Sequence, residues 1–176
     1  HDGTLSIEIV GDHPERRTIQ ARLSPDPVRA KQLETLRARN GALRPRDLWR
    51  LSFVACWTGG SMGHYLSRVR ESWGQIPIRD IGLLASEGRI SIPLDDDTPI
   101  GAVDLSAGVF EFIPVEDFDA SAPRVYWADE LETGRDYAVV MTNTAGLLRY
   151  RLDDIVRVHG YLNRSPLIEF LYRGGR

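Results

Sequence analysis

The spacing of apolar residues changes several times along the chain and predicts different elements in turn. Residues 1 to 24 have no clear period, and we expect a loop with some helix there. After Asp26-Pro27, a sequence typical of a helix start, apolar residues recur at helical spacing until Asn40-Gly41. The apolar positions are Ala30, Leu33 and Leu36. A short amphipathic helix is therefore predicted here.

Residues 51 to 84 have the pattern of a strand-helix-strand unit. The continuous apolar run from Leu51 to Trp57 predicts a buried strand, and a glycine-rich turn follows it. A helical apolar face then ends at Gly74, and Ile78 to Leu84 forms a second apolar run. We expect the two strands to be parallel and joined by a right-handed crossover.

Beyond Gly88 the chain changes to short strand-like segments separated by Asp-, Gly- or Pro-containing loops, which favours an antiparallel sheet or small barrel. The predicted strands are Ile90 to Leu94, Val109 to Ile113, Tyr137 to Thr142, Leu147 to Arg151, Ile155 to Val158 and Leu167 to Tyr172. The fold class is α/β (α+β), with a strand-helix-strand layer followed by an antiparallel, barrel-like β subdomain. We place the boundary between residues 1–88 and residues 89–176.

Composition and charge restrict the classes of function. The 176 residues are 42% hydrophobic and 27% charged, which is enough apolar content for a packed core. The formal net charge of -3 argues against a nucleic-acid or membrane-surface partner, and no apolar run reaches the roughly 18 residues of a membrane span. With no leader-like opening segment, a cytoplasmic location is expected. Cys56 is the one cysteine, and we expect it to be a buried small hydrophobe.

Four aromatic residues are first interpreted as core positions rather than as stacking platforms for a ligand. They are Trp57, Trp73, Phe110 and Phe112. The four histidines show no paired spacing for a metal, and no Ser-His-Asp constellation can be argued. No residue is named as catalytic.

Asp153-Asp154 stands where an arginine-flanked strand is expected to turn. A carboxylate fixed there can accept hydrogen bonds from the two hydroxyls of a ribose, each worth roughly 1.5 to 3 kcal/mol. The alternative is a turn whose aspartates bond their own backbone. The pattern by itself leaves both interpretations open.

Ser86-Glu87-Gly88 ends a predicted strand at the edge of the α/β half where ligands usually bind. Glu87 could hold Mg²⁺ while Ser86 contacts a phosphate oxygen, because magnesium takes one or two carboxylates plus phosphate oxygens. The alternative is a strand-ending turn with a solvated glutamate.

Gly59-Gly60-Ser61-Met62-Gly63 would let the backbone approach a flat or anionic ligand, since glycine has no Cβ. Its spacing matches neither common phosphate-loop motif, so a plain strand-to-helix turn is the competing interpretation.

Taken in order, the chain's motifs resemble the Gretchen Hagen auxin-responsive family of acyl acid amido synthetases, within the adenylate-forming superfamily. The matching segments are Asp2 to Ser6, Cys56 to Gly63, Ala85 to Gly88, Phe110 to Pro114, and Gly146 to Val158 with Gly160-Tyr161 and Ser165-Pro166 beyond. The resemblance implies use of ATP and Mg²⁺ to adenylate a carboxylic acid, followed by transfer of the acyl group to an amine such as an amino acid.

The resemblance also implies roles for individual residues in nucleotide binding. Glu87 resembles the residue at the phosphate and magnesium, Asp154 the ribose-binding aspartate, and Arg173 the arginine before the interdomain hinge. The other positions that match nucleotide-binding segments are Gly59, Gly60, Ser61 and Ser86. Leu83 occupies a position where relatives often have an aromatic residue, and Asp153 one where glycine is frequent.

We expect a fragment of a bacterial-type member of that family, from the later part of its large N-terminal domain. The chain has one lysine, Lys31, and no Gly/Ser/Thr-rich phosphate loop with a lysine. By itself it is expected to be inactive, with the missing remainder of its own chain as a partner. The rival interpretation is a non-catalytic module that binds nucleotide, protein or nucleic acid.

Overall fold

The computed structural model describes residues 14–175 of the chain. The chain forms two compact units, His1–Arg50 and Leu51–Arg176. The turn-like motif Asp2 to Ser6 lies outside the described residues. The subdomain boundary expected near residue 89 is a division within the second unit, and it stays a prediction.

The described residues of the first unit form three helices, α1 (Pro14–Gln20), α2 (Pro27–Asn40) and α3 (Pro45–Leu48). Helix α2 confirms the predicted start and end: Asp26 Oδ1 accepts a hydrogen bond from the Arg29 backbone amide at 2.8 Å, and Gly41 ends the helix at φ 78°. The guanidinium of Arg29 also donates to the Asp47 carbonyl at 2.7 Å, which ties α3 to α2. Local capping therefore fixes this unit's main helix.

The second unit begins with the predicted strand-helix-strand arrangement. Strands β1 (Val54–Ala55) and β2 (Ile78–Arg79) are parallel neighbours, and α4 (Leu66–Trp73) lies between them in the chain. Both strands are only two residues long, shorter than the apolar runs suggested. A 3₁₀ helix, η1 (Gly60–Tyr65), separates the glycine turn from α4. The parallel pairing is confirmed, and so is the end of the helix at Gly74.

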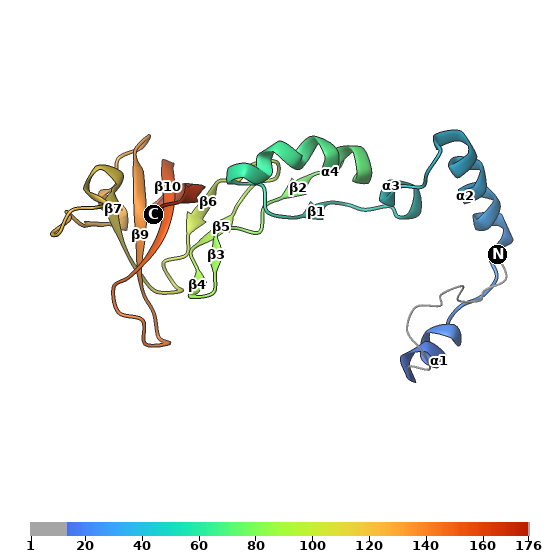
Figure 1. Ribbon diagram of the computed structural model, residues 1–176, viewed down its shortest axis with the longest axis horizontal. Coiled ribbons are helices and arrows are strands. Elements are labelled where there is room, and N and C mark those ends of the chain that lie inside the picture. The colour runs from blue at the N-terminus through green and yellow to red at the C-terminus, as the bar shows by residue number, and fades with distance from the viewer. Residues whose placement is uncertain (1–13, 176) are drawn as a thin grey trace. The chain divides into compact units, whose positions relative to one another are not determined.

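An antiparallel sheet makes up most of the second unit (Figure 1). Its strands, in spatial order, are β5 (Ser91–Pro93), β6 (Gly101–Val103), β11 (Ser165–Arg173), β10 (Tyr150–Leu162), β9 (Asp136–Thr142), β7 (Val109–Pro114) and β8 (Tyr126–Trp127). The sheet is open, with β5 and β8 at its two edges. A separate hairpin pairs β3 (Leu84–Ala85) with β4 (Gly88–Arg89).

Two of the strand predictions are wrong in an informative way. Leu147 to Arg151 and Ile155 to Val158 are predicted as separate strands, but one strand, β10, begins at Tyr150 and continues without a break to Leu162. The apolar run Ile78 to Leu84 is instead broken at Asp80, so that β2 and β3 belong to different sheets. A short polar break in a pattern does not distinguish a bulge from a turn, because both interrupt the alternation.

The sheet carries apolar side chains on both faces. The larger core includes Phe110, Phe112 and Tyr137, and the half-buried Phe170 packs against it. A smaller core contains Ile113, Ala138, Val140 and Ile155. Phe110 and Phe112 are buried as predicted, but Trp57 is 42% exposed and leans on Phe170, with ring centroids 5.4 Å apart. The interpretation of Trp57 as a core residue is therefore wrong.

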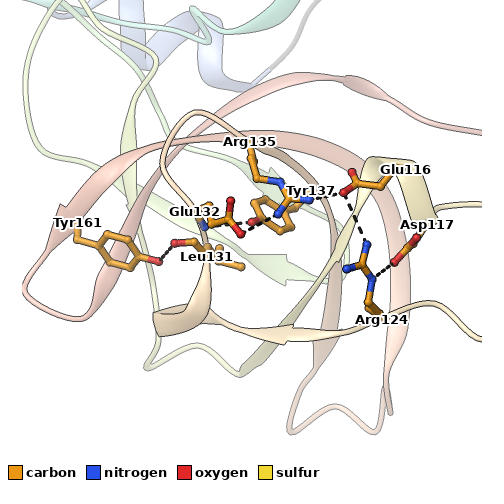
Figure 2. A network of polar contacts seen from close by, with 8 residues as sticks. All are labelled: Glu116, Asp117, Arg124, Leu131, Glu132, Arg135, Tyr137 and Tyr161. Atoms are coloured by element: carbon orange, nitrogen blue, oxygen red, sulfur yellow. Dashed lines mark hydrogen bonds and ion pairs between the residues drawn. The ribbon is translucent and has the colours of Figure 1, made fainter.

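A polar network joins loops beside β7, β9 and β10 (Figure 2). The hydroxyl of the buried Tyr137 accepts a hydrogen bond from the Glu132 backbone amide at 3.0 Å. Arg135 pairs with Glu116 and Glu132 and lies over the Tyr137 ring, 5.8 Å from its centroid. Tyr161 donates to the Leu131 carbonyl at 2.6 Å. The network fixes these loops to the sheet.

Within residues 14–175, the structure contains no helix with the length and apolarity that a membrane crossing requires.

Candidate nucleotide-binding site

The glycine turn packs against strand β11, and its shape depends on the absence of side chains. Gly60 has φ +56°, a region that residues with a Cβ rarely adopt. A Cβ at Gly60 would lie 3.0 Å from the Leu171 carbonyl oxygen, and one at Gly59 would lie 3.5 Å from the Phe170 carbonyl oxygen. Ser61 is exposed at the start of η1. The turn thus brings residues 59–61 to β11 a short distance before Arg173.

The Ser86-Glu87 turn connects β3 and β4 and rests on the end of β9. The Asn143 side chain donates to the Glu87 carbonyl oxygen at 2.8 Å, and a Cβ at Gly88 would lie 2.7 Å from the Met141 methyl. Ser86 is exposed and Glu87 half-buried, so both side chains reach solvent. The hairpin is therefore anchored through its backbone, which leaves the Glu87 carboxylate available.

Asp153 and Asp154 lie inside strand β10, and not at the strand-to-turn junction that the sequence suggested. Arg151 pairs with Val140 of β9 and Ile155 with Ala138, so β10 has two more residues than β9 in this stretch. Asp153 takes up the irregularity with φ 62°. Aspartate tolerates this left-handed conformation better than most residues, which explains how it stands where relatives often have glycine.

The two neighbouring aspartates have different surroundings. Asp153 Oδ1 accepts a hydrogen bond from Arg151 Nε at 2.7 Å, and Arg151 in turn stacks on Phe118 at 4.3 Å, beside the smaller core. Asp154 is only 8% exposed and pairs with Arg173 across the β10–β11 ladder. The Asp153 carboxylate is thus part of a local ion pair with Arg151, whereas the Asp154 carboxylate is buried opposite Arg173.

The charges of two other predicted site residues, Arg173 and Glu87, act on the carboxyl group of Asp154. Burial raises its pKa above the ordinary value, the charge of Arg173 lowers it, and the charges of Glu87 and Asp153 raise it. No residue among 14–175 donates a hydrogen bond to this side chain. Because no fully buried side-chain oxygen of the described residues lacks a partner, the Asp154 oxygens keep access to solvent. Asp154 and Arg173 are therefore neighbours across β10 and β11, and the charge of Glu87 acts on the same carboxyl group.

Asp154 is thus a buried acceptor whose hydrogen-bonding capacity is not used by the described residues. Its oxygens still reach solvent, so hydroxyl donors from a ligand would take the place of water at an acceptor to which the described residues donate nothing. Glu87 nearby offers a second carboxylate, and magnesium is commonly held by one or two carboxylates together with phosphate oxygens. The residues present fit a magnesium nucleotide, although no cluster of three potential metal-ligating side chains occurs within residues 14–175.

Leu83, the position where relatives often have an aromatic residue, is buried in the larger core. It packs on the sheet as an ordinary apolar side chain, and its exposed neighbour is Leu84. Cys56 is half-buried. Its thiol pKa is raised mainly by burial and, to a smaller extent, by the charge of Asp80. Neither residue offers reactive chemistry to the site.

Two residues that form hydrogen bonds with the segments carrying the predicted site residues were not identified from the sequence. Asn143 holds the Glu87 carbonyl and accepts hydrogen bonds from the backbone amides of Ala145 and Leu147. Asp80, at the end of β2, accepts hydrogen bonds from Thr58 and Gly82. The available signals were the turn-like sequences Thr142-Asn143 and Asp80-Ile81-Gly82, in which Asn and Asp bond backbone amides.

Both parts of the chain match domains of one protein family. Residues 1–78 match the model of the GH3 family N-terminal domain, and residues 101–173 match that of the GH3 family central domain. Jasmonoyl--L-amino acid synthetase JAR4 of Nicotiana attenuata is 31% identical over 98% of this chain, which spans 31% of that protein. The probable indole-3-acetic acid-amido synthetase GH3.6 of Oryza sativa subsp. japonica is 30% identical over 97% of the chain, which spans 38% of it.

A solved structure shows the same fold. The structure of AtGH3.15 acyl acid amido synthetase in complex with 2,4-DB superposes with a TM-score of 0.80 at 23% identity, over 99% of this chain and 31% of the other. The chain therefore spans about a third of the length of the relatives it matches. Residues 79–100 lie between the ranges that the two family models match.

Proposed function

We propose, from the premise that this chain belongs to the GH3 family, that it is part of an ATP-dependent acyl acid amido synthetase. The reaction would join a carboxylic acid to an amine such as an amino acid. The oxygen of the carboxylate would attack the α-phosphorus of ATP and release pyrophosphate. The amine nitrogen would then attack the acyl carbon, lose a proton and release AMP. We place the protein in the cytoplasm and keep the bacterial-type origin as a prediction, while the relatives named above are from plants.

One observation carries this proposal: Asp154 is a buried carboxylate that accepts no hydrogen bond from residues 14–175 and lies close to Glu87 and Arg173. In the proposed site, Asp154 accepts the hydroxyls of the ribose. Glu87 holds the magnesium ion, which when bound neutralises charge on the phosphates. Arg173 provides a positive charge beside the nucleotide, and Ser86 donates to a phosphate oxygen.

The remaining site residues shape the surface on which the nucleotide lies. Gly59 and Gly60 bring backbone close to the ligand because they lack Cβ atoms, and Ser61 offers an exposed hydroxyl next to them. Such a site works by positioning and charge neutralisation, which is what attack on a phosphoryl group requires. We therefore assign none of these residues a covalent role.

Binding of ATP with Mg²⁺ to the 176-residue chain tests the site directly. Asp154→Asn keeps the shape of the side chain but removes its charge, so nucleotide affinity should fall by about 10-fold or more, the effect of losing charge-assisted hydrogen bonds. Asp129→Asn is the matched control, since Asp129 is an exposed aspartate paired with Arg164. Equal affinities of the wild-type and Asp154→Asn chains, measured by calorimetry, would contradict the assignment.

Catalysis requires more than this site. We propose that the 176 residues alone do not form the acyl-adenylate, because no lysine-bearing phosphate loop is among them to receive the pyrophosphate leaving group. Exchange of labelled pyrophosphate into ATP measures this step. Exchange well above background by the chain, with any carboxylic acid, would refute this part of the proposal.

A further inference from the structure

Asp80 is a buried carboxylate that belongs to none of the predicted site residues. It is 4% exposed and accepts three hydrogen bonds at the end of strand β2. Oδ2 accepts from the Thr58 backbone amide at 2.5 Å and from the Thr58 hydroxyl at 2.6 Å. Oδ1 accepts from the Gly82 backbone amide at 2.7 Å. Both carboxylate oxygens are therefore used, and each serves a different segment of the chain.

The parallel pairing of β1 with β2 explains why these groups meet. Ala55 pairs with Arg79, so the residues that follow both strands leave the sheet at the same edge. Thr58 leads directly into Gly59-Gly60, and Gly82 leads into the β3–β4 hairpin that carries Glu87. This is the carboxyl edge of the parallel strands, where ligands of α/β sheets usually bind. One side chain thus joins the two segments that frame the proposed site.

Stabilisation of the fold does not by itself explain why a charged side chain is buried at Asp80. No cationic side chain within residues 14–175 forms an ion pair with Asp80, so its burial is offset by hydrogen bonds alone. Buried charges are weak contributors to stability, but a buried carboxylate with defined donors on both oxygens can favour one geometry. The three hydrogen bonds of Asp80 hold Thr58 and Gly82 in a defined position relative to each other.

We propose that Asp80 is a positioning residue that fixes the glycine turn at residues 58–60 relative to the Ser86-Glu87 hairpin. The inference rests on the proposed nucleotide site and extends it to a residue that contacts no ligand. Without the Asp80 hydrogen bonds, the two segments should move independently. Part of the binding free energy of the nucleotide would then be lost in ordering them.

Hydrogen exchange tests the connection without any ligand. Thr58→Val removes one hydrogen bond to Asp80 at nearly constant side-chain shape, while Thr58→Ser retains the hydroxyl. We expect the Gly82 amide to exchange about 10-fold faster in Thr58→Val and at the wild-type rate in Thr58→Ser. Unchanged exchange at Gly82 in Thr58→Val would overturn the coupling, because Gly82 and Thr58 are joined only through the Asp80 carboxylate in this proposal.

Nucleotide binding tests the purpose of the connection. Affinity for ATP with Mg²⁺ should fall about 10-fold in Asp80→Asn and several-fold in Thr58→Val, with Thr58→Ser restoring it. Tyr137→Phe is the control for a general loss of stability, since it removes a buried hydrogen bond in the network of Figure 2. It should leave the affinity unchanged. If Asp80→Asn does not fold, the two Thr58 variants provide the same comparison.

The outcomes separate this inference from the proposed function. A wild-type chain that binds nucleotide together with Asp80→Asn and Thr58→Val chains that bind it equally well would overturn the role of Asp80 alone. Affinity that falls as much in Tyr137→Phe as in Asp80→Asn would overturn it as well, because stability would then explain the loss. A wild-type chain that binds no nucleotide would overturn both proposals.

Discussion

Asp154 lies in the large sheet and Glu87 in the turn of a separate hairpin, yet the charge of Glu87 raises the pKa of the Asp154 carboxyl group. Asp154 lies in β10, and Glu87 lies in the turn between β3 and β4. Two acidic groups brought together in this way repel each other unless a cation or a hydrogen-bond donor lies between them. Arg173, opposite Asp154 in β11, supplies part of that compensation. The arrangement is suited to a ligand that carries both hydroxyl groups and a metal ion.

The pH dependence of folding should reveal the raised pKa of Asp154. Burial is the largest cause of the rise, so the folded state favours the protonated carboxyl more than the unfolded chain does. Its stabilising contribution is full below the unfolded pKa of about 3.9 and is lost as the pH rises through the folded pKa. Asp154→Asn should therefore gain stability relative to the wild type as the pH rises from 3 to 7. Urea unfolding at several pH values measures this, and a constant difference would show that the pKa is not shifted.

Asp153 offers a test of the irregular backbone in β10. Its φ of 62° is unfavourable for any residue with a Cβ, so Asp153→Ala should destabilise the fold by about 1 to 2 kcal/mol. Asp153→Gly should be near neutral, because relief of the strain offsets loss of the exposed ion pair with Arg151. At Asp136, an ion-paired residue of β9 outside the left-handed region, the order should reverse, with glycine about 0.5 to 1 kcal/mol worse than alanine. Chemical denaturation of the four variants provides the comparison, and the same order at both positions would contradict it.

Gly60 should be sensitive to a single added methyl group. Gly60→Ala combines a positive φ with a Cβ only 3.0 Å from the Leu171 carbonyl oxygen, so we expect a loss of about 1 to 3 kcal/mol. Gly63 is the matched control in the same segment, since its Cβ would lie 3.6 Å from the Thr58 carbonyl oxygen at an ordinary φ. Gly63→Ala should change the unfolding free energy little. Thermal unfolding of both variants measures the difference, and equal losses would show that the close approach to β11 is unimportant.

Tyr137 should contribute to stability through its hydroxyl group. Tyr137→Phe leaves the Glu132 backbone amide without its acceptor, and we expect a cost of about 0.5 to 1.5 kcal/mol in unfolding free energy. Tyr126 packs edge-on against Tyr137, and no residue among 14–175 forms a hydrogen bond with its hydroxyl. Tyr126→Phe should therefore have little effect, and urea denaturation of both variants compares them. An equal loss in the two variants would assign the effect to ring packing instead.

The sequence predicted the elements whose signals are local. Asp26, Pro27 and Gly41 marked the ends of α2, because capping depends on residues next to the helix. The alternation of apolar residues predicted β7, β9 and β11 closely, since these strands have buried faces. Strands β6 and β8 were missed because they are only two or three residues long, too short to show a period.

The position of Asp154 could not be derived from the local pattern. Asp153-Asp154 interrupts the apolar alternation whether the strand ends there or bulges, and only the partner strands decide between the two. The role proposed for Asp80 could not be predicted from the sequence for a similar reason. Its partner Thr58 is close only because β1 and β2 pair in parallel, which joins residues far apart in the chain.

By itself, the sequence determined the caps of α2, the strands β7, β9 and β11, the family and the candidate nucleotide-binding residues, because each depends on short motifs or on local periodicity. Tertiary structure alone decided that Asp154 lies buried within a continuous strand near Glu87 and Arg173, and that Asp80 joins the two segments framing the site. The physical reason is that hydrogen bonds and charges act through space, whereas a sequence pattern reports only the neighbours along the chain.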